Sequence, residues 1–222
     1  MSSEERRGAT AAADAWNERY ARTRQVWSGE PNATLVAELE GVAPGRALDV
    51  GCGEGADAIW LAGQGWQVSA LDVSEVALDR ARAAARRAGV DVEWIHAGLL
   101  EASLGDRVFD LVSVQYPALL RTPSNTAEHA LLASVAPGGH LLVVHHVLDD
   151  RRIAQAKAGG FVPADHVWPA DVAQVLDDNW TVEFEAGRPR NVSAPQPRRR
   201  SACPASRART DITQSSMLRR LR

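Results

Sequence analysis

The sequence predicts an α/β domain in which helices cover both faces of a doubly wound, mostly parallel sheet of about seven strands. Short apolar runs alternate with helical segments along the chain, which indicates successive βαβ units. The runs 111–114 and 141–144 lack polar alternation, as is typical of strands that helices bury on both faces. A glycine-rich turn lies between the first of the expected strands and the helix after it.

Each expected element follows from a local pattern. Apolar runs predict strands over 47–50, 67–72, 92–96, 111–115 and 140–145, and two late strands over 180–185 and 213–219. Helical patterns cover 11–23, 32–39, 55–64, 74–88, 126–134 and 169–176. Asn32 and Ser74 are the expected N-caps, and Gly89 ends the helix that begins at Ser74. The arginines of that helix, at 80, 82, 86 and 87, are expected on its solvent-exposed face.

Composition bounds the class of protein. The 222 residues suffice for one enzyme domain that needs no disulfide or metal to fold. Cys52 and Cys203 stand far apart and show no disulfide or metal-ligand spacing, which favours a cytoplasmic protein without a metal. No apolar run approaches the roughly 20 residues that span a bilayer, so we expect no membrane partner.

Charge is distributed unevenly. The net charge is −3, yet residues 188–222 contain ten arginines and a single acidic residue. Such a basic tail could contact nucleic acid, but it lacks aromatic and helical elements for reading bases. We therefore favour a solvated extension over a nucleic-acid partner.

The turn after the first strand predicts a nucleotide-derived cofactor. Its glycines let the backbone approach a ligand too closely for a Cβ atom, and the next residues open a helix. Two acidic residues, Asp49 and Glu54, flank this turn and would repel the pyrophosphate of a dinucleotide. S-adenosylmethionine instead carries an ammonium and a sulfonium, so it suits this turn better.

Polar residues follow the other strands as well. Asp72 ends the second strand, about 20 residues after the turn, where a ribose-binding acid is expected. Residues 97–99 follow the third strand, 115–117 the fourth and 145–146 the fifth. Because the carboxyl ends of parallel strands share one edge of a sheet, we expect all of these residues beside one ligand.

Four features of the sequence together resemble the class I S-adenosylmethionine-dependent methyltransferases. They are the turn 48–55, Asp72, the stretch Phe109-Asp110-Leu111-Val112 and the stretch Pro137-Gly138-Gly139-His140-Leu141. The resemblance extends over about residues 16–184 and implies a Rossmann-like fold. The segments 16–20 and 26–32 resemble the branch with tellurite-resistance and thiopurine methyltransferases, which act on small, soft nucleophiles.

The resemblance implies a role for each matching residue. Asp49 would attract the ammonium, and Asp72 would accept both ribose hydroxyls. The implied cofactor-binding set is Asp49, Gly51, Cys52, Gly53, Asp72, Val73, Gly98, Leu99, Gln115 and Trp27. Gly98 stands where the family often has an acid for the adenine amino group, so we expect cofactor binding to be weaker by about 1.5–3 kcal/mol.

The acceptor side of the site is less defined by the sequence. Methyl transfer from a sulfonium is an in-line displacement, so a catalytic base is optional. A thiol, selenium or tellurium nucleophile needs none, whereas a hydroxyl or amine would use His145 or His146. As neighbours on one strand, His145 and His146 are expected to point to opposite faces of the sheet. Tyr116 either lies beside the transferred methyl group or only ends its strand.

We expect residues 1–13 to be disordered, 14–187 to form the methyltransferase domain and 188–222 to be the basic tail. Within the domain, 14–40 would form an N-terminal helical lid and 46–147 the cofactor-binding core, and Trp16 and Trp27 belong to either lid or core. The expected protein is a monomer or homodimer that methylates a small molecule and releases S-adenosylhomocysteine. The alternatives are a dinucleotide-dependent oxidoreductase, a methyltransferase of nucleic acid or protein, and a degenerate cofactor-binding protein.

Overall fold

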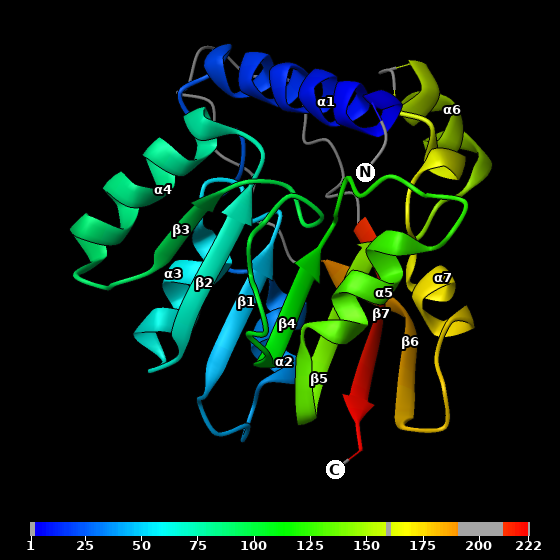
Figure 1. Ribbon diagram of the computed structural model, residues 1–222. Helices are drawn as coiled ribbons and strands as arrows, with labels where there is room; N and C mark the ends of the chain where they lie inside the picture. Colours follow the sequence, from blue (N-terminus) through cyan, green and yellow to red (C-terminus); the bar gives the residue numbers. More distant parts are fainter. Residues whose placement is uncertain (1–2, 159–160, 191–210, 222) are drawn as a thin grey trace, which may run out of the picture.

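Seven strands form one sheet at the centre of the molecule (Figure 1). The computed structural model describes residues 3–158, 161–190 and 211–221. The strands are β1 (Arg46–Val50), β2 (Gln67–Asp72), β3 (Glu93–His96), β4 (Phe109–Gln115), β5 (Val135–His146), β6 (Trp180–Arg190) and β7 (Asp211–Arg220). Their order is β3-β2-β1-β4-β5-β7-β6, with β1 to β5 parallel and β7 antiparallel to both of its neighbours.

Helices cover both faces of the sheet. The helices are α1 (Ser3–Ala21), α2 (Ala33–Glu38), α3 (Ala56–Gly63), α4 (Glu75–Ala88), α5 (Thr126–Ala133), α6 (Asp150–Ala158) and α7 (Pro169–Gln174), with a 3-10 turn at Pro163–Asp165. On one face Leu35 and Leu61, from α2 and α3, pack in a single cluster with Leu142 of β5. On the other face Leu131 and Val172, from α5 and α7, pack with β-strand residues that include Val50 and Val143. The doubly wound, mostly parallel architecture expected from the sequence is confirmed.

The boundaries of α4 follow from its caps. The Ser74 Oγ accepts a hydrogen bond from the Ala77 amide at 3.2 Å, and Gly89 closes the helix in the left-handed region with φ of 69°. Both residues were expected in these roles. At α2, Asn32 occupies the N-cap position without making a capping hydrogen bond, because its side chain donates instead to Asp57 Oδ2 at 2.7 Å.

The N-terminal segment differs from its expectation. We expected disorder over 1–13 and a helix from Ala11, whereas α1 already begins at Ser3. The alanines at 9 and 11–13 explain the extension, because alanine has the highest intrinsic helix propensity. In Figure 1, α1 lies across the top of the molecule, above the carboxyl ends of the parallel strands.

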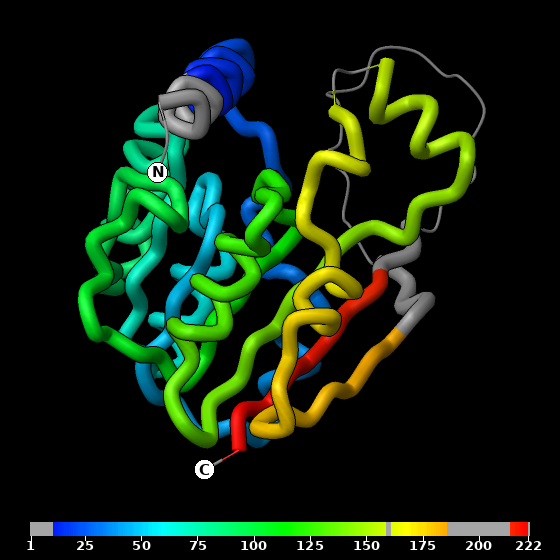
Figure 2. Tube along the Cα trace, turned by 45° about the vertical axis from the view of Figure 1, so that its right-hand side comes forward, coloured from blue at the N-terminus to red at the C-terminus, as the bar shows by residue number. Residues whose placement is uncertain are grey.

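The C-terminal segment supplies an internal strand of the sheet, next to its edge strand β6. The strand expected near 213–219 is β7, which lies between β5 and β6 and not at the edge of the sheet (Figure 2). Residues 188–190 were expected in the basic tail but continue β6, and 191–210 lie outside the described residues. Among the described residues, no helix combines the length and apolar character needed to cross a membrane.

Candidate cofactor and acceptor site

The carboxyl ends of β1 and β2 bring two buried acids to one edge of the sheet. Asp49 pairs in register with Ala70 of β2, and Asp72 is the last residue of that strand. Both carboxylates are less than a tenth exposed. The sequence expectation that these two residues meet at one site agrees with the parallel pairing of their strands.

Asp49 is a buried carboxylate with one oxygen unsatisfied. Among the described residues, Oδ2 of Asp49 has no hydrogen-bond partner. Burial, with Asp57 and Asp72 nearby, raises the pKa of Asp49 well above its usual range. Asp57 has partners of its own, since it accepts hydrogen bonds from the backbone and side-chain nitrogens of Asn32 at 2.6 and 2.7 Å. A cation beside Asp49 would offset the free-energy cost of burying a carboxylate with one unsatisfied oxygen.

Backbone amides hold Asp72 in place. Its Oδ2 accepts from the Gly53 amide and its Oδ1 from the Ser74 amide, both at 2.8 Å. Burial raises the pKa of Asp72, and these hydrogen bonds oppose that rise. Each carboxylate oxygen can accept more than one hydrogen bond, so the fixed carboxylate can also accept from ligand hydroxyls.

The three glycines of the turn have different surroundings. A Cβ atom at Gly51, where φ is +73°, would meet nothing within 4 Å. At Gly53 it would lie 2.8 Å from Tyr20 Oη and 3.2 Å from Trp27 Nε1. At Gly55 it would lie 2.7 Å from the Trp94 ring. Thus Gly51 opens onto free space, Gly53 lies under the N-terminal segment, and Gly55 allows helix packing.

Glu54 does not face the turn's ligand space as we expected. Its carboxylate accepts hydrogen bonds from the Val26 and Trp27 amides and forms an ion pair with Arg80 at 2.8 Å. Arg80 also donates to the carbonyls of Tyr20 and Thr23, both at 2.6 Å, so its expected place on the solvent-exposed face is wrong. The two side chains form a clasp, the Glu54–Arg80 clasp, that holds residues 20–27 against the turn.

Tyr20 was missed as a site residue by sequence reasoning. It is 2% exposed, and its hydroxyl accepts a hydrogen bond from Trp27 Nε1 at 2.9 Å above Gly53. Burial raises the pKa of Tyr20, so it stays protonated and can donate a hydrogen bond. Trp27 itself is 39% exposed, which suits a cover over the site better than a core residue. No local signal in the sequence linked Tyr20 to Gly53.

The other residues implied for the cofactor vary in access. Cys52 is half-buried, and burial and Asp49 raise the pKa of its thiol. Leu99 is 5% exposed and packs in the core, so only its backbone can contact a ligand. Gly98 lies beside Val73 at the end of β3, and the side chain of Glu101 crosses it.

Comparisons with known proteins agree with this geometry. Residues 47–139 match the model of a methyltransferase domain family. An uncharacterized methyltransferase of Mycobacterium tuberculosis is 36% identical over 105 residues, which are 47% of this chain and 52% of that protein. This chain contains a class I S-adenosylmethionine-dependent methyltransferase domain. The family expected from the sequence is therefore confirmed, and the chain spans about half the length of the curated relatives it matches first.

Solved methyltransferase structures share the fold of this domain. The N-methyltransferase NodS of Bradyrhizobium japonicum, in complex with S-adenosylhomocysteine, superposes with a TM-score of 0.59 over 84% of each chain at 22% identity. TehB of Haemophilus influenzae superposes with a TM-score of 0.58, over 85% of this chain and 62% of its own, at 14% identity. Identities this low carry the fold alone, so the expected tellurite-resistance branch stays a prediction.

His145, near the end of β5, is buried against an aromatic ring. It is 4% exposed and its ring stacks on Trp168 at 3.6 Å. Its Nδ1 accepts a hydrogen bond from the His146 amide at 3.0 Å. Burial lowers the pKa of His145 to about 3, so the ring is neutral near pH 7. With Nδ1 engaged by the backbone, His145 is poorly placed to accept a proton from an acceptor molecule.

His146 and Tyr116 form a second ring pair, and His146 lies on the face of the sheet opposite His145, as expected for neighbours on a strand. The ring centroids of this pair are 4.5 Å apart. Tyr116 has φ of 52°, an uncommon conformation for a non-glycine residue that redirects the chain at the end of β4. Next to it, Gln115 Oε1 is buried without a partner among the described residues, while its Nε2 donates to Ser113 Oγ at 3.3 Å.

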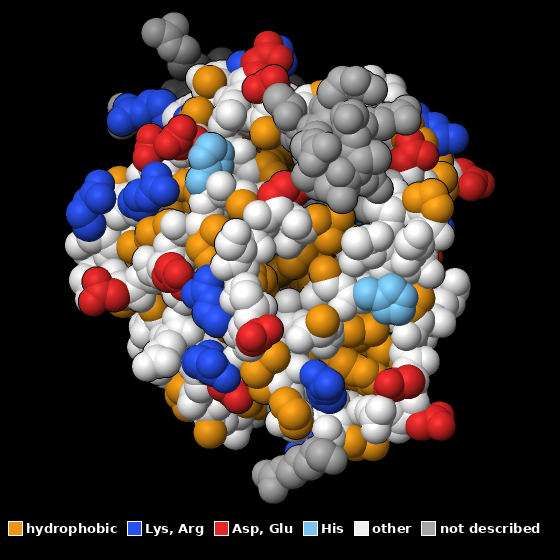
Figure 3. Space-filling view, in the orientation of Figure 1, with side chains coloured by type: hydrophobic (Ala, Val, Ile, Leu, Met, Phe, Trp, Pro, Cys, Tyr) orange, Lys and Arg blue, Asp and Glu red, His pale blue; other side chains and the backbone are white. Residues whose placement is uncertain are grey.

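The surface is hollowed near the centre of the view in Figure 3, where hydrophobic side chains form the floor. In the ribbon of Figure 1 this position corresponds to the carboxyl end of β4.

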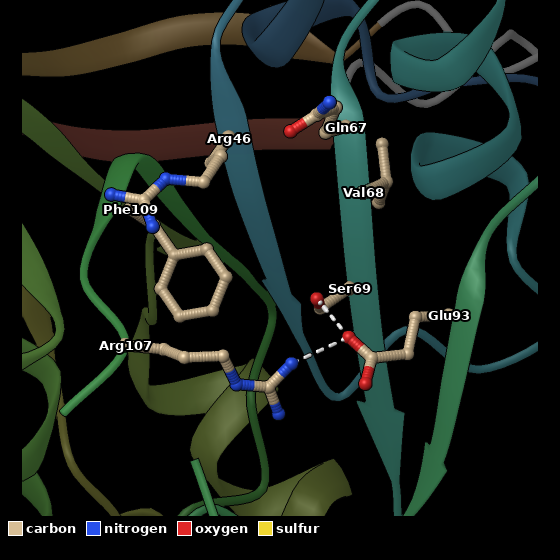
Figure 4. Close-up of a pocket in the computed structure, with 7 residues that line it drawn as sticks. All are labelled: Arg46, Gln67, Val68, Ser69, Glu93, Arg107 and Phe109. Carbon is tan, nitrogen blue, oxygen red and sulfur yellow. Dashed lines mark hydrogen bonds and ion pairs between the residues drawn. The ribbon is translucent and has the colours of Figure 1, made fainter. Parts of the chain in front are cut away.

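A separate cavity of about 240 Å³ lies at the amino ends of the strands, between Arg46, Gln67 and Phe109 (Figure 4). In this cavity, the Glu93 carboxylate accepts hydrogen bonds from Ser69 Oγ at 2.5 Å and from Arg107 at 2.7 Å. These polar groups of the cavity therefore already bind one another. Within the described part of the chain, no group of acids, histidines and cysteines could hold a metal ion.

Proposed function

We propose that this chain transfers a methyl group from S-adenosylmethionine to a small-molecule acceptor. The observation that carries the proposal is the buried Oδ2 of Asp49, which has no hydrogen-bond partner among the described residues, two residues before Gly51, where a Cβ would meet open space. A ligand with a cationic ammonium satisfies this oxygen, whereas a pyrophosphate would be repelled by the same carboxylate.

Other residues of the site fit the remaining parts of the cofactor. Asp72, fixed by two backbone amides, would accept hydrogen bonds from the ribose hydroxyls. Val73 would pack on the adenine, and Trp27 and Tyr20 would cover the methionine part and exclude water. The bound cofactor supplies a methyl group on a positively charged sulfur, which is already activated for displacement. The protein's contribution is alignment, since an in-line displacement depends on the geometry of donor and nucleophile.

The acceptor that best suits this site is a soft nucleophile, such as a thiol or a selenium or tellurium compound. His145 is engaged by backbone and ring contacts, so it is not the base that a hydroxyl or amine acceptor would require. His146 and Tyr116, whose rings lie 4.5 Å apart, are then the residues that would contact the acceptor. A thiolate or an oxyanion of selenium or tellurium reacts without proton removal by the protein.

Calorimetric titration tests the cofactor part of the proposal. The wild-type protein should bind S-adenosylhomocysteine, and Asp49→Ala should weaken binding by about tenfold or more, since a charge-assisted contact is lost. Asp79→Ala, on the exposed side of α4, is the matched control and should leave the dissociation constant unchanged. Absence of binding by the folded wild-type protein would contradict the proposal.

A transfer assay with a labelled methyl group tests the acceptor. We expect label in small thiols, selenite or tellurite, and none in RNA or peptide substrates. His145→Gln should retain more turnover than His146→Gln if only His146 contacts the acceptor. Transfer to RNA in preference to every small acceptor would instead favour the nucleic-acid alternative. A cytoplasmic location and a monomeric or homodimeric state stay predictions.

A further inference from the structure

The side chain of Glu101 occupies the space that a side chain at position 98 would fill. A Cβ atom built on Gly98 would overlap Oε2 of Glu101, and its next contacts would be Glu101 Cδ and Val73 Cγ1, both at 3.4 Å. The Glu101 carboxylate therefore lies over the end of β3, next to the residue implied for the adenine.

A tight turn produces this placement. The Glu101 and Ala102 amides both donate to the Gly98 carbonyl, at 3.3 and 2.9 Å. This turn reverses the chain directly after β3 and returns the Glu101 side chain across Gly98. The absence of a Cβ at Gly98 is what leaves room for the carboxylate, because the backbone of Gly98 is not in the left-handed region that would require glycine.

The strand order would bring the base of a cofactor bound at Asp49 and Asp72 to this position. Neighbouring strands are about 4.8 Å apart, so the carboxyl ends of β1, β2 and β3 extend over roughly 10 Å. With its ammonium at Asp49 and its ribose at Asp72, an extended cofactor reaches the end of β3 with its adenine. His96 ends that strand in register with Asp72, and Gly98 follows two residues later.

From this geometry we infer that Glu101 binds the exocyclic amino group of the adenine, in place of the acid that is missing at position 98. An amino group on a purine only donates hydrogen bonds, and an ionised carboxylate only accepts them, so the pair is complementary. The inference rests on the proposed function, because it assigns a specificity residue within the same cofactor site. It also replaces our sequence expectation of a weakened adenine contact with a contact made by another residue.

Titration calorimetry with two ligands tests this assignment on the whole chain. The ligands are S-adenosylhomocysteine and S-inosylhomocysteine, which has an oxo group where adenine has the amino group. Wild type should prefer the adenine ligand by about tenfold, and Glu101→Ala should abolish most of that preference by weakening the adenine ligand. Glu40→Ala changes another exposed glutamate, before the amino end of β1, and should retain the full preference.

Two variants at Gly98 separate this role from a general effect on folding. Gly98→Ala displaces the flexible end of Glu101 and should reduce the preference while leaving the melting temperature nearly unchanged. Gly98→Asp combined with Glu101→Ala should restore the preference, because the introduced carboxylate would then fill the vacated space, and Val73 Cγ1 lies at an ordinary contact distance of 3.4 Å from the new Cβ.

The outcomes distinguish the two proposals. If wild type binds neither ligand, the proposed function fails. If wild type binds both ligands equally, or if Glu101→Ala keeps the preference for adenine, the role of Glu101 is refuted while the methyltransferase proposal stands. A Glu101→Ala variant that binds S-adenosylhomocysteine more tightly would show that the carboxylate obstructs the base, which also refutes the inference.

Discussion

Asp49 shows at the scale of one residue how a proposed binding site opposes stability. Its burial beside Asp57 and Asp72 raises its pKa, so ionising it costs the free protein folding free energy. A raised pKa means that the group's contribution to stability is present at low pH and is lost as pH rises through the folded-state pKa. A binding partner with positive charge reverses this penalty, which is why the arrangement suits a cationic ligand.

We therefore predict that Asp49→Asn stabilises the free protein while it weakens cofactor binding. The difference in unfolding free energy between variant and wild type should grow as pH rises from about 4 to 8, because only the wild type must ionise a buried acid. Urea unfolding at several pH values measures this difference. A variant that is less stable than wild type at neutral pH would show that Asp49 is a structural cap of the turn.

His145 gives a second pH prediction with the opposite direction. Its pKa is lowered to about 3 by burial, so between the ordinary histidine pKa and pH 3 only the unfolded chain takes up this proton. Stability should fall with acidification in that range, by at most about 1.4 kcal/mol per pH unit from this residue. His145→Phe keeps a ring for Trp168 and should show a shallower fall. Equal slopes in the two proteins would contradict the assigned environment.

At the scale of elements, the turn between β1 and α3 combines two kinds of glycine. Gly51→Ala should lower the free energy of unfolding by about 1 kcal/mol, because alanine is strained at this positive φ. The added Cβ meets no protein atom within 4 Å, so no clash adds to this loss, but the Cβ should weaken binding of S-adenosylhomocysteine. Gly55→Ala adds a clash with Trp94 and Ala81 and should destabilise by about 2–4 kcal/mol. Thermal unfolding and calorimetry separate these effects, and equal destabilisation by both variants would contradict the distinction.

The Glu54–Arg80 clasp links α4 to the segment after α1. Arg80→Ala removes the ion pair and two hydrogen bonds to carbonyl oxygens, so residues 22–27 should open more often. Trypsin cleavage after Arg22 or Arg24 should become about tenfold faster, from the loss of roughly 1.5 kcal/mol. Arg82→Ala, which removes only a pair with Asp79 on the same helix, should cleave at the wild-type rate. Equal rates in both variants would show that the clasp does not hold the segment.

At the scale of the whole molecule, the sheet depends on the last strand of the chain. β7 separates β5 from β6 and buries Leu218, Ser215 and Ser216. Deleting residues 211–222 would expose the β5 edge and leave β6 without a partner in the sheet. We predict loss of cooperative thermal unfolding in circular dichroism, and aggregation in size-exclusion chromatography. A folded, monomeric truncation would contradict this role of β7.

The residues expected as a basic tail contribute both charge and a strand of the sheet. Truncation after Gly187 would remove β7, so lost RNA binding in such a variant would report unfolding. Replacing the arginines at 198–200 by serine changes the tail's charge and leaves every described strand intact. RNA affinity that falls with these replacements would support the nucleic-acid alternative.

The central elements of the fold were predictable because their signals are local. β2 has the bounds that its apolar run predicts, and α4 begins and ends at the capping residues in its sequence. The strand β5 begins five residues earlier than expected, because Val135 pairs with Phe109 across a register shift that no local pattern encodes. Helix α6 was not expected, since none of its residues is buried and its sequence has no apolar face.

The sequence by itself determined the parallel sheet, the glycine turn after Asp49 and the acid Asp72 at the end of β2, because strand periodicity and backbone conformation depend on near neighbours. Only the tertiary structure decided what lies opposite those residues. It placed Tyr20 over Gly53, turned Glu54 towards Arg80, and brought the Glu101 carboxylate across Gly98. These contacts depend on how the N-terminal segment and the turn after β3 pack in space, and residue spacing along the chain carries no record of that packing.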